Sequence, residues 1–486
     1  MALNVVIAAP EAVPFAKTGG LADVAGSLPA ALSRLGLRVV LFMPFYRQVA
    51  DKGFELEPTG IEVAVPMGRR VVRAEALLGH HQGVPVYFIK RDEFFDRTYL
   101  YGTPEGDYFD NLERYAFFSR AILEVLKARN LSPDIIHCND WQTGLIPAYL
   151  RDMYRGEPIF RKTATVFTVH NIAYQGQFPA NLYDATGLSF QLFNPEGLEF
   201  WGSINLLKAG LVFSDAITTV SKAYSREIQR PEYGYGLDGV LRKRKDSVFG
   251  ILNGVDYSEW DPESDPAIPE NYSPSDLKGK SACRKKLLKA FGLKGIKAKT
   301  LLIGMITRLA DQKGLDILSE AMPELMKMDI ALVILGSGDR SHQEGLKELS
   351  ARYPERLSVR IAFDSELSHL VEAGADAFLM PSRYEPCGLN QIYSLKYGTV
   401  PIVRATGGLD DTVRGYPDED GNGFKFKEYS ASALIEKVAE AVDVYSRKKE
   451  WTTLQRRGMA DNFSWDDAAA KYLEAYNTAK ARLHKS

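Results

Sequence analysis

The chain of 486 residues is too long for a single hydrophobic core, so we expect two or three domains. Its composition, with 45% hydrophobic and 25% charged residues and no low-complexity tract, is ordinary for a soluble globular protein. The 60 Lys and Arg residues nearly balance the 62 Asp and Glu residues, and the net charge of −2 argues against a general binder of nucleic acid or other polyanions.

The three cysteines, Cys138, Cys283 and Cys387, are widely separated and form no CxxC pair. This pattern argues against a disulfide framework or a structural zinc site, and it fits a reducing cytoplasm. No apolar run approaches the roughly 20 residues that a membrane helix needs, and the first residues lack the basic start of a signal peptide. We therefore expect a cytoplasmic protein that has no membrane partner. No feature of the sequence specifies an oligomeric state.

The first 45 residues read as a strand, a helix and a second strand. Residues 4–9 and 39–43 are short apolar runs, and residues 21–35 carry apolar side chains at the helical period. Pro29 lies inside the helical pattern and predicts a kink there.

The loop between the first strand and helix carries Glu11, Lys17, Gly19 and Gly20. Glycines let backbone amides approach a ligand, and the lysine ammonium supplies a point charge. The spacing matches neither the GxGxxG dinucleotide fingerprint nor a P-loop, so neither a dinucleotide site nor an NTPase is predicted.

Two polar residues, Asp140 and His170, directly follow predicted strands. The carboxyl ends of parallel strands meet at one edge of a sheet, so we expect both residues beside the glycine-rich loop. This position favours a functional role for both, and a structural role for the neighbouring His137. The pattern behind this expectation has strands at residues 60–91 (an insertion), 134–138, 163–169 and 216–220, and helices at 107–127, 143–150 and 204–212.

A second alternating pattern begins after the basic run 242–245 and a segment rich in Asp, Pro and Ser, residues 261–276. Alternating strands and helices predict a second parallel, doubly wound sheet, and therefore an α/β fold with two such domains. A final helix is expected at about residues 464–483, where it could pack back on the first domain. The strands are predicted at residues 301–307, 331–335, 357–361, 377–380 and 400–403.

In the motif RLADQKG, residues 308–314, Arg308 and Lys313 flank the turn that leads into a helix from Gly314. The helix macrodipole disfavours cations at this end, so helix stability does not explain them. An anion held between the two side chains does, and two phosphate groups fit best. A solvated, charged loop is the alternative.

The stretch PSRYEPCGLNQ, residues 381–391, places the carboxylate of Glu385 between a buried strand and a new helix. Ligands bind at this position in open α/β sheets, and the amides of Gly388, Leu389 and Asn390 would be first-turn donors for an anionic group. Glu385 could accept hydrogen bonds from ligand hydroxyls. A surface turn with a salt-bridged glutamate is the alternative.

Seven motifs in this order and spacing resemble those of bacterial glycogen synthases, which share a glycosyltransferase family with starch synthases. The resemblance covers nearly the whole chain. The motifs are KTGGLADV at residues 17–24, NDW at 139–141, FTVHN at 167–171, ILNGVD at 251–256, RLADQKG at 308–314, PSRYEPCGL at 381–389 and TGGL at 406–409.

The resemblance implies a GT-B fold, in which two Rossmann-like domains face a central cleft. The N-terminal, acceptor-side domain would span residues 1–248, the donor-side domain 249–462, and the C-terminal helix 463–486. The implied reaction transfers glucose from ADP-glucose to the non-reducing end of glycogen or another α-1,4-glucan, with retention of configuration and no cofactor. The candidate residues are divided between two sheets, so we expect the site to assemble when the domains close.

The resemblance also implies roles for individual residues. Lys17, Arg308 and Lys313 would meet the donor diphosphate, Glu385 the glucose, and Asp140 and His170 the acceptor side and the sugar. Gln142, Tyr384 and Pro10 depart from the common family residues His, Phe and Ser. The further substrate contacts are Glu11, Gly19, Gly20, Asn253, Tyr384, Cys387, Gly388, Leu389, Thr406, Gly407 and Gly408.

The residue types fit this chemistry, because preorganised cations stabilise the charge that develops on a departing diphosphate. No obvious cluster of carboxylates would hold a Mg²⁺ ion, so we predict no metal. Retention could follow a double displacement, for which Glu385 is a candidate nucleophile by type. We favour front-face attack, because the resemblance places Glu385 on the sugar hydroxyls.

Other functions fit the same fold. A phosphorylase would need pyridoxal phosphate, which absorbance reveals, and a nucleotide-sugar epimerase would need no glucan. A non-catalytic carbohydrate-binding protein would have no use for a diphosphate clamp. The residues alone do not separate ADP-glucose from UDP-glucose, because base contacts would be spread over several loops.

Overall fold

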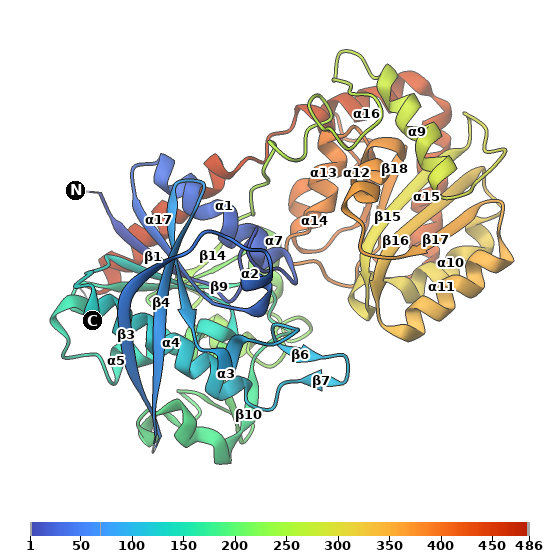
Figure 1. Cartoon of the computed structure of the whole chain (residues 1–486). Helices are drawn as coiled ribbons and strands as arrows, with labels where there is room; N and C mark the ends of the chain where they lie inside the picture. Colours follow the sequence, from blue (N-terminus) through green and yellow to red (C-terminus); the bar gives the residue numbers. More distant parts are fainter. Residues whose placement is uncertain (1, 69, 484–486) are drawn as a thin grey trace. The chain divides into compact units, whose positions relative to one another are not determined.

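The computed structural model describes residues 2–68 and 70–483, and the chain divides into two compact units (Figure 1). Unit 1 comprises Met1–Gly254 together with Trp465–Ser486, and unit 2 comprises Val255–Ser464. The first boundary lies after Gly254, beyond the 248 suggested by the sequence, because β14 (Val248–Gly250) pairs with a strand of unit 1.

Unit 1 is built on a nine-stranded sheet in the order β14-β13-β9-β8-β1-β2-β5-β4-β3. Pairing is parallel from β14 to β5 and antiparallel from β5 to β3, so the predicted insertion is an antiparallel extension of the sheet. The strands are β1 (Asn4–Ala8), β2 (Arg38–Pro44), β3 (Glu57–Met67), β4 (Arg70–His81), β5 (Val84–Lys90), β8 (Ile135–Asn139), β9 (Ala164–Val169) and β13 (Ala216–Thr219).

The helices of unit 1 include two long ones that pack on this sheet. The first, α1 (Gly20–Arg34), continues through Pro29, and α17 (Trp465–Leu483) packs against α1 and β9, as Figure 1 shows in red. A hydrogen bond of 2.9 Å joins Tyr476 of α17 to His137 Nδ1, and burial lowers the pKa of His137 to about 3. The other helices are α2 (Arg47–Asp51), α3 (Asp92–Phe95), α4 (Asn111–Ala128), α5 (Leu145–Arg151), α6 (Leu206–Phe213), α7 (Lys222–Glu227) and α8 (Asp238–Lys243).

Two small sheets complete unit 1. One contains three strands in the order β10 (Gln177–Pro179), β12 (Ser203–Asn205) and β11 (Glu199–Phe200), and the other pairs β6 (Gly102–Thr103) with β7 (Gly106–Asp107). The tight turn between β11 and β12 contains Trp201, which is exposed to solvent.

Unit 2 is built on a six-stranded, wholly parallel sheet in the order β17-β16-β15-β18-β19-β20. Its central strands are buried apolar runs, as expected for a sheet covered on both faces. The strands are β15 (Leu301–Leu309), β16 (Ile330–Gly338), β17 (Leu357–Ile361), β18 (Ala377–Met380), β19 (Val400–Arg404) and β20 (Phe424–Phe426). The helices are α9 (Lys278–Ala290), α10 (Leu315–Leu325), α11 (Arg340–Arg352), α12 (Ser365–Gly374), α13 (Asn390–Lys396), α14 (Gly407–Thr412), α15 (Ala431–Ser446) and α16 (Lys448–Ala460).

Strand β16 runs three residues beyond its predicted end at Leu335. Gly336 and Gly338 pair with Thr307 and Leu309, and a Cβ at Gly336 would lie 2.0 Å from the Thr307 carbonyl oxygen. These glycines therefore extend the sheet where the sequence suggested a turn.

The strand orders place a topological switch point in each unit. In unit 2 it lies between β15 and β18, and in unit 1 between β1 and β8, because the crossover connections run in opposite directions from these pairs. Ligands bind in open α/β sheets beyond the carboxyl ends of the strands at such points.

The three cysteines are all free and buried. Within residues 2–68 and 70–483, no helix is both long enough and apolar enough to cross a membrane.

Candidate active site

An ion pair between Lys313 and Glu385 lies at the switch point of unit 2. Lys313 ends a short 3₁₀ turn after β15, and Glu385 lies in the loop after β18. Lys313 Nζ is 2.6 Å from Glu385 Oε2, and both side chains are largely buried. The hydroxyl of Ser382 donates a second hydrogen bond of 3.0 Å to the same oxygen. In the protein by itself, the anion that faces Lys313 is thus the carboxylate of Glu385, and the predicted phosphate ligand stays a prediction.

Backbone contacts hold the loops around this pair together. Gly314 has a φ of 73°, and a Cβ there would lie 2.0 Å from the Pro381 carbonyl oxygen. The Arg383 N–H donates to the Gln312 carbonyl at 2.8 Å, and Gln312 Nε2 donates to the Tyr384 carbonyl at 3.1 Å. Any larger residue at position 314 would separate the two loops.

The TGGL loop joins the same cluster through its two glycines. A Cβ on Gly407 would lie 1.9 Å from the Glu385 carbonyl oxygen, and one on Gly408 would lie 1.8 Å from that of Cys387. The Gly408 N–H donates to the Glu385 carbonyl at 3.0 Å. Thr406, buried, is the N-cap residue of α14. Three predicted motifs therefore form one packed cluster.

Helix α13 begins at Asn390, two residues later than expected, with Leu389 as its N-cap. The reason is Gly388, whose φ of 69° lies in the left-handed region. The Gln391 side chain holds this bend by donating to the carbonyls of Cys387 and Gly388 at 3.1 and 2.9 Å. The amide of Gly388 thus belongs to a bend that precedes the helix.

Arg308 lies near the end of β15, where it pairs with Ser337 of β16 in an exposed position. The structure thus places it on the strand that leads into the Lys313 turn, five positions earlier in the chain. Both cations therefore belong to the same edge of the unit 2 sheet.

In unit 1, Asp140 lies at the tip of β8 with φ 55° and ψ −178°. This conformation is costly for any residue except glycine, and such strain is concentrated at functional sites. The Asp140 carboxylate accepts a hydrogen bond of 2.8 Å from the His170 N–H, which confirms that the two residues meet. Burial, reinforced by the charge of Glu11, raises the pKa of Asp140 to about 8 despite this hydrogen bond.

The imidazole of His170 is neutral and its tautomer is fixed. Burial lowers its pKa to about 3. The Asn139 amide donates through Nδ2 to the Ala8 carbonyl at 3.1 Å, so its Oδ1 faces His170 Nε2 at 2.9 Å. His170 Nε2 therefore carries the proton, and Nδ1 is the acceptor nitrogen.

The loop after β1 brings Glu11 close to Asp140. Glu11 is buried and accepts hydrogen bonds from the N–H and the hydroxyl of Thr18, the latter at 2.8 Å. Burial nevertheless raises the pKa of Glu11 to about 7. Lys17 is half exposed and lies 2.7 Å from Asp23 of α1.

The glycines of this loop differ in what they pack against. A Cβ on Gly19 would meet no atom within 4 Å, and Gly20 is the first residue of α1. Packing inside the protein therefore does not require the glycine at position 19. A ligand that approaches the backbone here would require glycine at this position.

Sequence reasoning missed several residues around this cluster. Thr18 and Asn139 lay inside the recognised motifs, and their roles needed the geometry. Tyr101 gave no sequence signal: its hydroxyl is buried, has no hydrogen-bond partner among the described residues, and has a raised pKa because of burial and of Glu11. Asn253, by contrast, is one of the predicted substrate contacts; it is buried in unit 1, and no described group hydrogen-bonds its Oδ1 atom.

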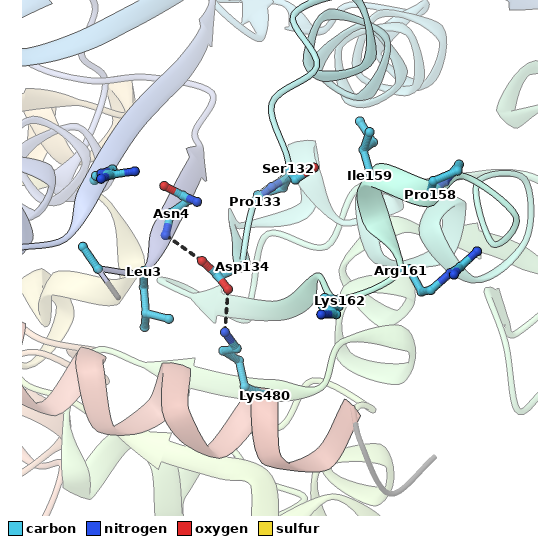
Figure 2. Close-up of a pocket in the computed structure, with 12 residues that line it drawn as sticks. Leu3, Asn4, Ser132, Pro133, Asp134, Pro158, Ile159, Arg161, Lys162 and Lys480 are labelled. Atoms are coloured by element: carbon cyan, nitrogen blue, oxygen red, sulfur yellow. Dashed lines mark hydrogen bonds and ion pairs between the residues drawn. The ribbon is translucent and has the colours of Figure 1, made fainter.

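A pocket of about 810 Å³ lies at the opposite edge of the unit 1 sheet, beside the first residues of β1 and β8. Asp134 accepts hydrogen bonds there from the Asn4 N–H at 2.9 Å and from Lys480 at 2.5 Å (Figure 2). Its lining contains none of the predicted site residues, so its size does not make it the candidate active site. The remaining charged lining residues are Arg38, Arg161 and Lys162.

Across the part of the chain that the structure describes, no group of three or more His, Cys, Asp or Glu side chains is arranged to hold a metal ion.

Two family models match successive parts of the chain. Residues 4–243 match the starch synthase catalytic domain, and residues 289–456 match the glycosyl transferases of group 1. With the parallel strands around the switch point of each sheet, these matches define an α/β glycosyltransferase of the GT-B fold.

Full-length relatives identify the family. A glycogen synthase of Syntrophotalea carbinolica is 47% identical, with 99% of this chain and 100% of that protein covered, and one of Myxococcus xanthus is 48% identical, with 97% and 98% covered. The structure of the catalytic domain of starch synthase IV from Arabidopsis thaliana, bound to ADP and acarbose, is 32% identical with a TM-score of 0.91, and 99% of this chain and 100% of that chain are covered. The chain belongs to the glycogen and starch synthase family, which confirms the resemblance seen in its motifs.

Proposed function

We propose that this enzyme transfers glucose from ADP-glucose to the non-reducing end of an α-1,4-glucan, with retention at the anomeric carbon and without a metal ion. The observation that carries the proposal is the buried pair of Lys313 and Glu385 at the switch point of unit 2. The glycogen synthase relatives and the ADP named for starch synthase IV support the choice of donor and acceptor.

Unit 2 binds the donor. Lys313 uses one of its three N–H groups for Glu385, and the others serve the diphosphate. Arg308, earlier at the same sheet edge, adds a guanidinium that suits paired phosphate oxygens. As the glucose–phosphate bond breaks, negative charge collects on the departing ADP, and these fixed cations stabilise it.

Glu385 binds the glucose hydroxyls. Its contacts with Lys313 and Ser382 both use Oε2, which leaves Oε1 to accept from the sugar. A carboxylate held in this way is better suited to position glucose than to attack it. We therefore propose front-face attack by the acceptor hydroxyl, through a transition state with oxocarbenium character.

Unit 1 binds the acceptor and the reacting sugar. Asp140 and Glu11 have raised pKa values, and His170 is neutral, so the cluster presents hydrogen-bonding groups with little net charge near neutral pH. Sugar hydroxyls both donate and accept, and such a cluster can match them. We assign Lys17 as a further cation that contacts the diphosphate, and Gly19 as the position at which the ligand approaches the backbone.

The test is transfer of labelled glucose to glycogen from ADP-glucose and from UDP-glucose, each with and without EDTA. We expect transfer from ADP-glucose that EDTA does not reduce, and a product that α-1,4-specific amylases degrade. A preference for UDP-glucose would overturn the donor assignment, and loss of activity with EDTA would overturn metal independence. Release of inverted product from a non-polymeric acceptor would contradict retention.

A further inference from the structure

The pocket beside the first residues of β1 and β8 concentrates positive charge. It has a volume of about 810 Å³ and lies wholly within unit 1. Across the whole chain, 60 Lys and Arg residues are balanced by 62 Asp and Glu residues. The described residues that line this pocket include four cations and a single carboxylate, namely Arg38, Arg161, Lys162, Lys480 and Asp134.

The carboxylate of Asp134 offsets only one of these cations. It accepts hydrogen bonds from Lys480 of α17 at 2.5 Å and from the Asn4 N–H at 2.9 Å, as Figure 2 shows. The other three cations, Arg38, Arg161 and Lys162, are exposed, and within residues 2–68 and 70–483 no carboxylate forms an ion pair with them. Like charges around one cavity repel one another, and an anion bound among them would offset this repulsion.

Hydrogen bonds hold the walls of the pocket in place. The Arg38 N–H donates to the Leu3 carbonyl at 2.9 Å, which joins the start of β2 to the start of β1. The Thr163 hydroxyl donates to the Pro133 carbonyl at 2.7 Å, which joins the segment 158–163 to the residues before β8. The backbone that carries the cations is therefore fixed before any ligand binds.

We propose that this pocket binds a small phosphate-bearing anion with at least two negative charges. Guanidinium groups suit paired phosphate oxygens, and lysine ammonium groups add point charges. The volume lies within the range of about 300–1,000 Å³ that is typical of small-molecule sites. Leu3, Pro133 and Ile159 also line the pocket, and they can contact the carbon frame of an organic phosphate.

The pocket is separate from the candidate active site of unit 1. It lies at the starts of β1 and β8, whereas the Glu11 loop and Asp140 follow the ends of these strands. A bound anion would also contact Lys480 of α17, the last helix of the chain. Such a ligand binds residues that only the folded unit brings together, so it stabilises unit 1 and raises the thermal midpoint with ligand concentration.

The direct test is isothermal titration calorimetry of the full-length protein with inorganic pyrophosphate as the probe. The variant Arg161→Ala/Lys162→Ala should bind it roughly 10-fold more weakly or worse, the scale of one lost hydrogen bond to a charged group. Both side chains are exposed, so without added anion the thermal midpoint should equal that of wild type. Equal affinity of variant and wild type overturns the proposal.

Two variants control for binding elsewhere. Pyrophosphate also suits the candidate donor site, and Arg308→Ala removes an exposed cation there without touching the pocket. Arg73→Ala/Arg155→Ala removes two exposed cations of unit 1 that do not line the pocket. Both variants should retain binding at the pocket. If Arg308→Ala abolishes all binding, or if the double control weakens binding as strongly as Arg161→Ala/Lys162→Ala, the proposal fails.

A substitution at Asp134 tests the site in the opposite direction. Asp134→Asn keeps an oxygen that accepts from the Asn4 N–H, removes the negative charge from the lining and leaves Lys480 to face the anion. The affinity for pyrophosphate should rise roughly threefold or more, because a repulsive charge near the anion is lost. General damage to the fold would not tighten binding. An unchanged or weaker affinity contradicts the proposed site.

A second probe, glucose 1,6-bisphosphate, distinguishes the sources of the anion. If it binds more tightly than pyrophosphate, and Arg161→Ala/Lys162→Ala weakens it, the ligand is an organic phosphate whose carbon frame contacts the apolar wall. Tighter binding of pyrophosphate, weakened in the same variant, assigns an inorganic polyphosphate. Both results support the proposal, and wild-type protein that binds neither probe overturns it.

The transfer assay keeps this proposal separate from the proposed function. Without added phosphate, Arg161→Ala/Lys162→Ala should transfer glucose with the wild-type kcat, because the pocket lies at the far edge of the sheet from the candidate active site. Loss of transfer in this variant would place its residues in the active site and overturn a separate site. Wild-type protein that transfers no glucose would contradict the proposed function, and the calorimetry would still test the pocket.

Discussion

The two units share an architecture and differ in whether their buried carboxylates have a cationic partner. Each places its candidate residues beyond the carboxyl ends of the two strands at its switch point. Unit 2 pairs a buried carboxylate with a lysine 2.6 Å away. In unit 1, no described residue forms an ion pair with the buried Glu11 or Asp140, and burial raises both pKa values.

This difference matches two kinds of ligand. A lysine and a carboxylate that are paired in a packed cluster can meet a phosphate group and a hydroxyl side by side. A cluster that is close to neutral binds hydroxyl groups through hydrogen bonds, and the neutral His170 belongs to such a cluster. In the function proposed above, the same sheet edge serves an anionic leaving group in unit 2 and a sugar in unit 1.

The largest expected effect comes from the cations of unit 2. Lys313→Ala or Arg308→Ala should lower kcat by roughly 10²-fold or more, the scale of one lost electrostatic contact in a transition state. Steady-state assays with ADP-glucose and glycogen measure it. The matched control is Lys327→Ala, which breaks an exposed pair with Glu324 in the same unit and should change kcat little. Wild-type turnover in the first two variants would mean that the RLADQKG turn, residues 308–314, is only a solvated loop.

Glu385 should tolerate glutamine better than alanine. Glutamine keeps an oxygen that accepts from the sugar, so Glu385→Gln should retain roughly 10-fold more activity than Glu385→Ala, the scale of one hydrogen bond. Comparison of kcat/KM for the two variants measures this. Equal inactivity of both, with a glycosyl adduct trapped elsewhere on the protein, would argue against front-face attack.

Two glycine substitutions, one in each unit, test whether the glycine is needed for packing inside the protein or for contact with a ligand. Gly408→Ala should destabilise unit 2 by about 1–3 kcal/mol, because its Cβ would overlap the Cys387 carbonyl oxygen. Gly19→Ala should leave stability within about 0.5 kcal/mol of wild type and still reduce activity, because only a ligand would meet its methyl group. Thermal unfolding and transfer assays on both variants decide this. If Gly19→Ala keeps wild-type activity, the ligand does not approach the backbone of unit 1 at this position.

The smallest expected effect is a pH dependence in unit 1. The folded-state pKa of Asp140 is about 8, against 3.8 for an ordinary aspartate, so the folded state binds this proton more tightly than the unfolded state. The contribution of Asp140 to stability is therefore full below about pH 4 and is lost as the pH rises through about 8. Asp140→Asn should raise the thermal midpoint at pH 8 and raise it less at pH 5. Asp466→Asn, which changes an exposed aspartate of unit 1, is the control. If the difference in thermal midpoint between Asp140→Asn and wild type does not change with pH, the raised pKa of Asp140 is contradicted.

The sequence by itself determined the two-sheet α/β organisation and most of the candidate residues. The buried strand β18 is a short apolar run with turn residues on both sides, so local composition fixes its bounds. Motif order and spacing identified the family and the residues that follow the strands. The predicted meeting of Asp140 and His170 needed only the rule that parallel strands end at one edge.

Tertiary structure alone decided how those residues are charged and oriented. No local pattern reveals that Lys313 faces Glu385, because 72 residues separate them along the chain. The proton on His170 Nε2 depends on Asn139 and on the Ala8 carbonyl of a neighbouring strand, and the raised pKa of Asp140 depends on burial by the whole unit. Composition and period report which residues are buried, whereas hydrogen bonds and desolvation arise from groups that only the folded chain brings together.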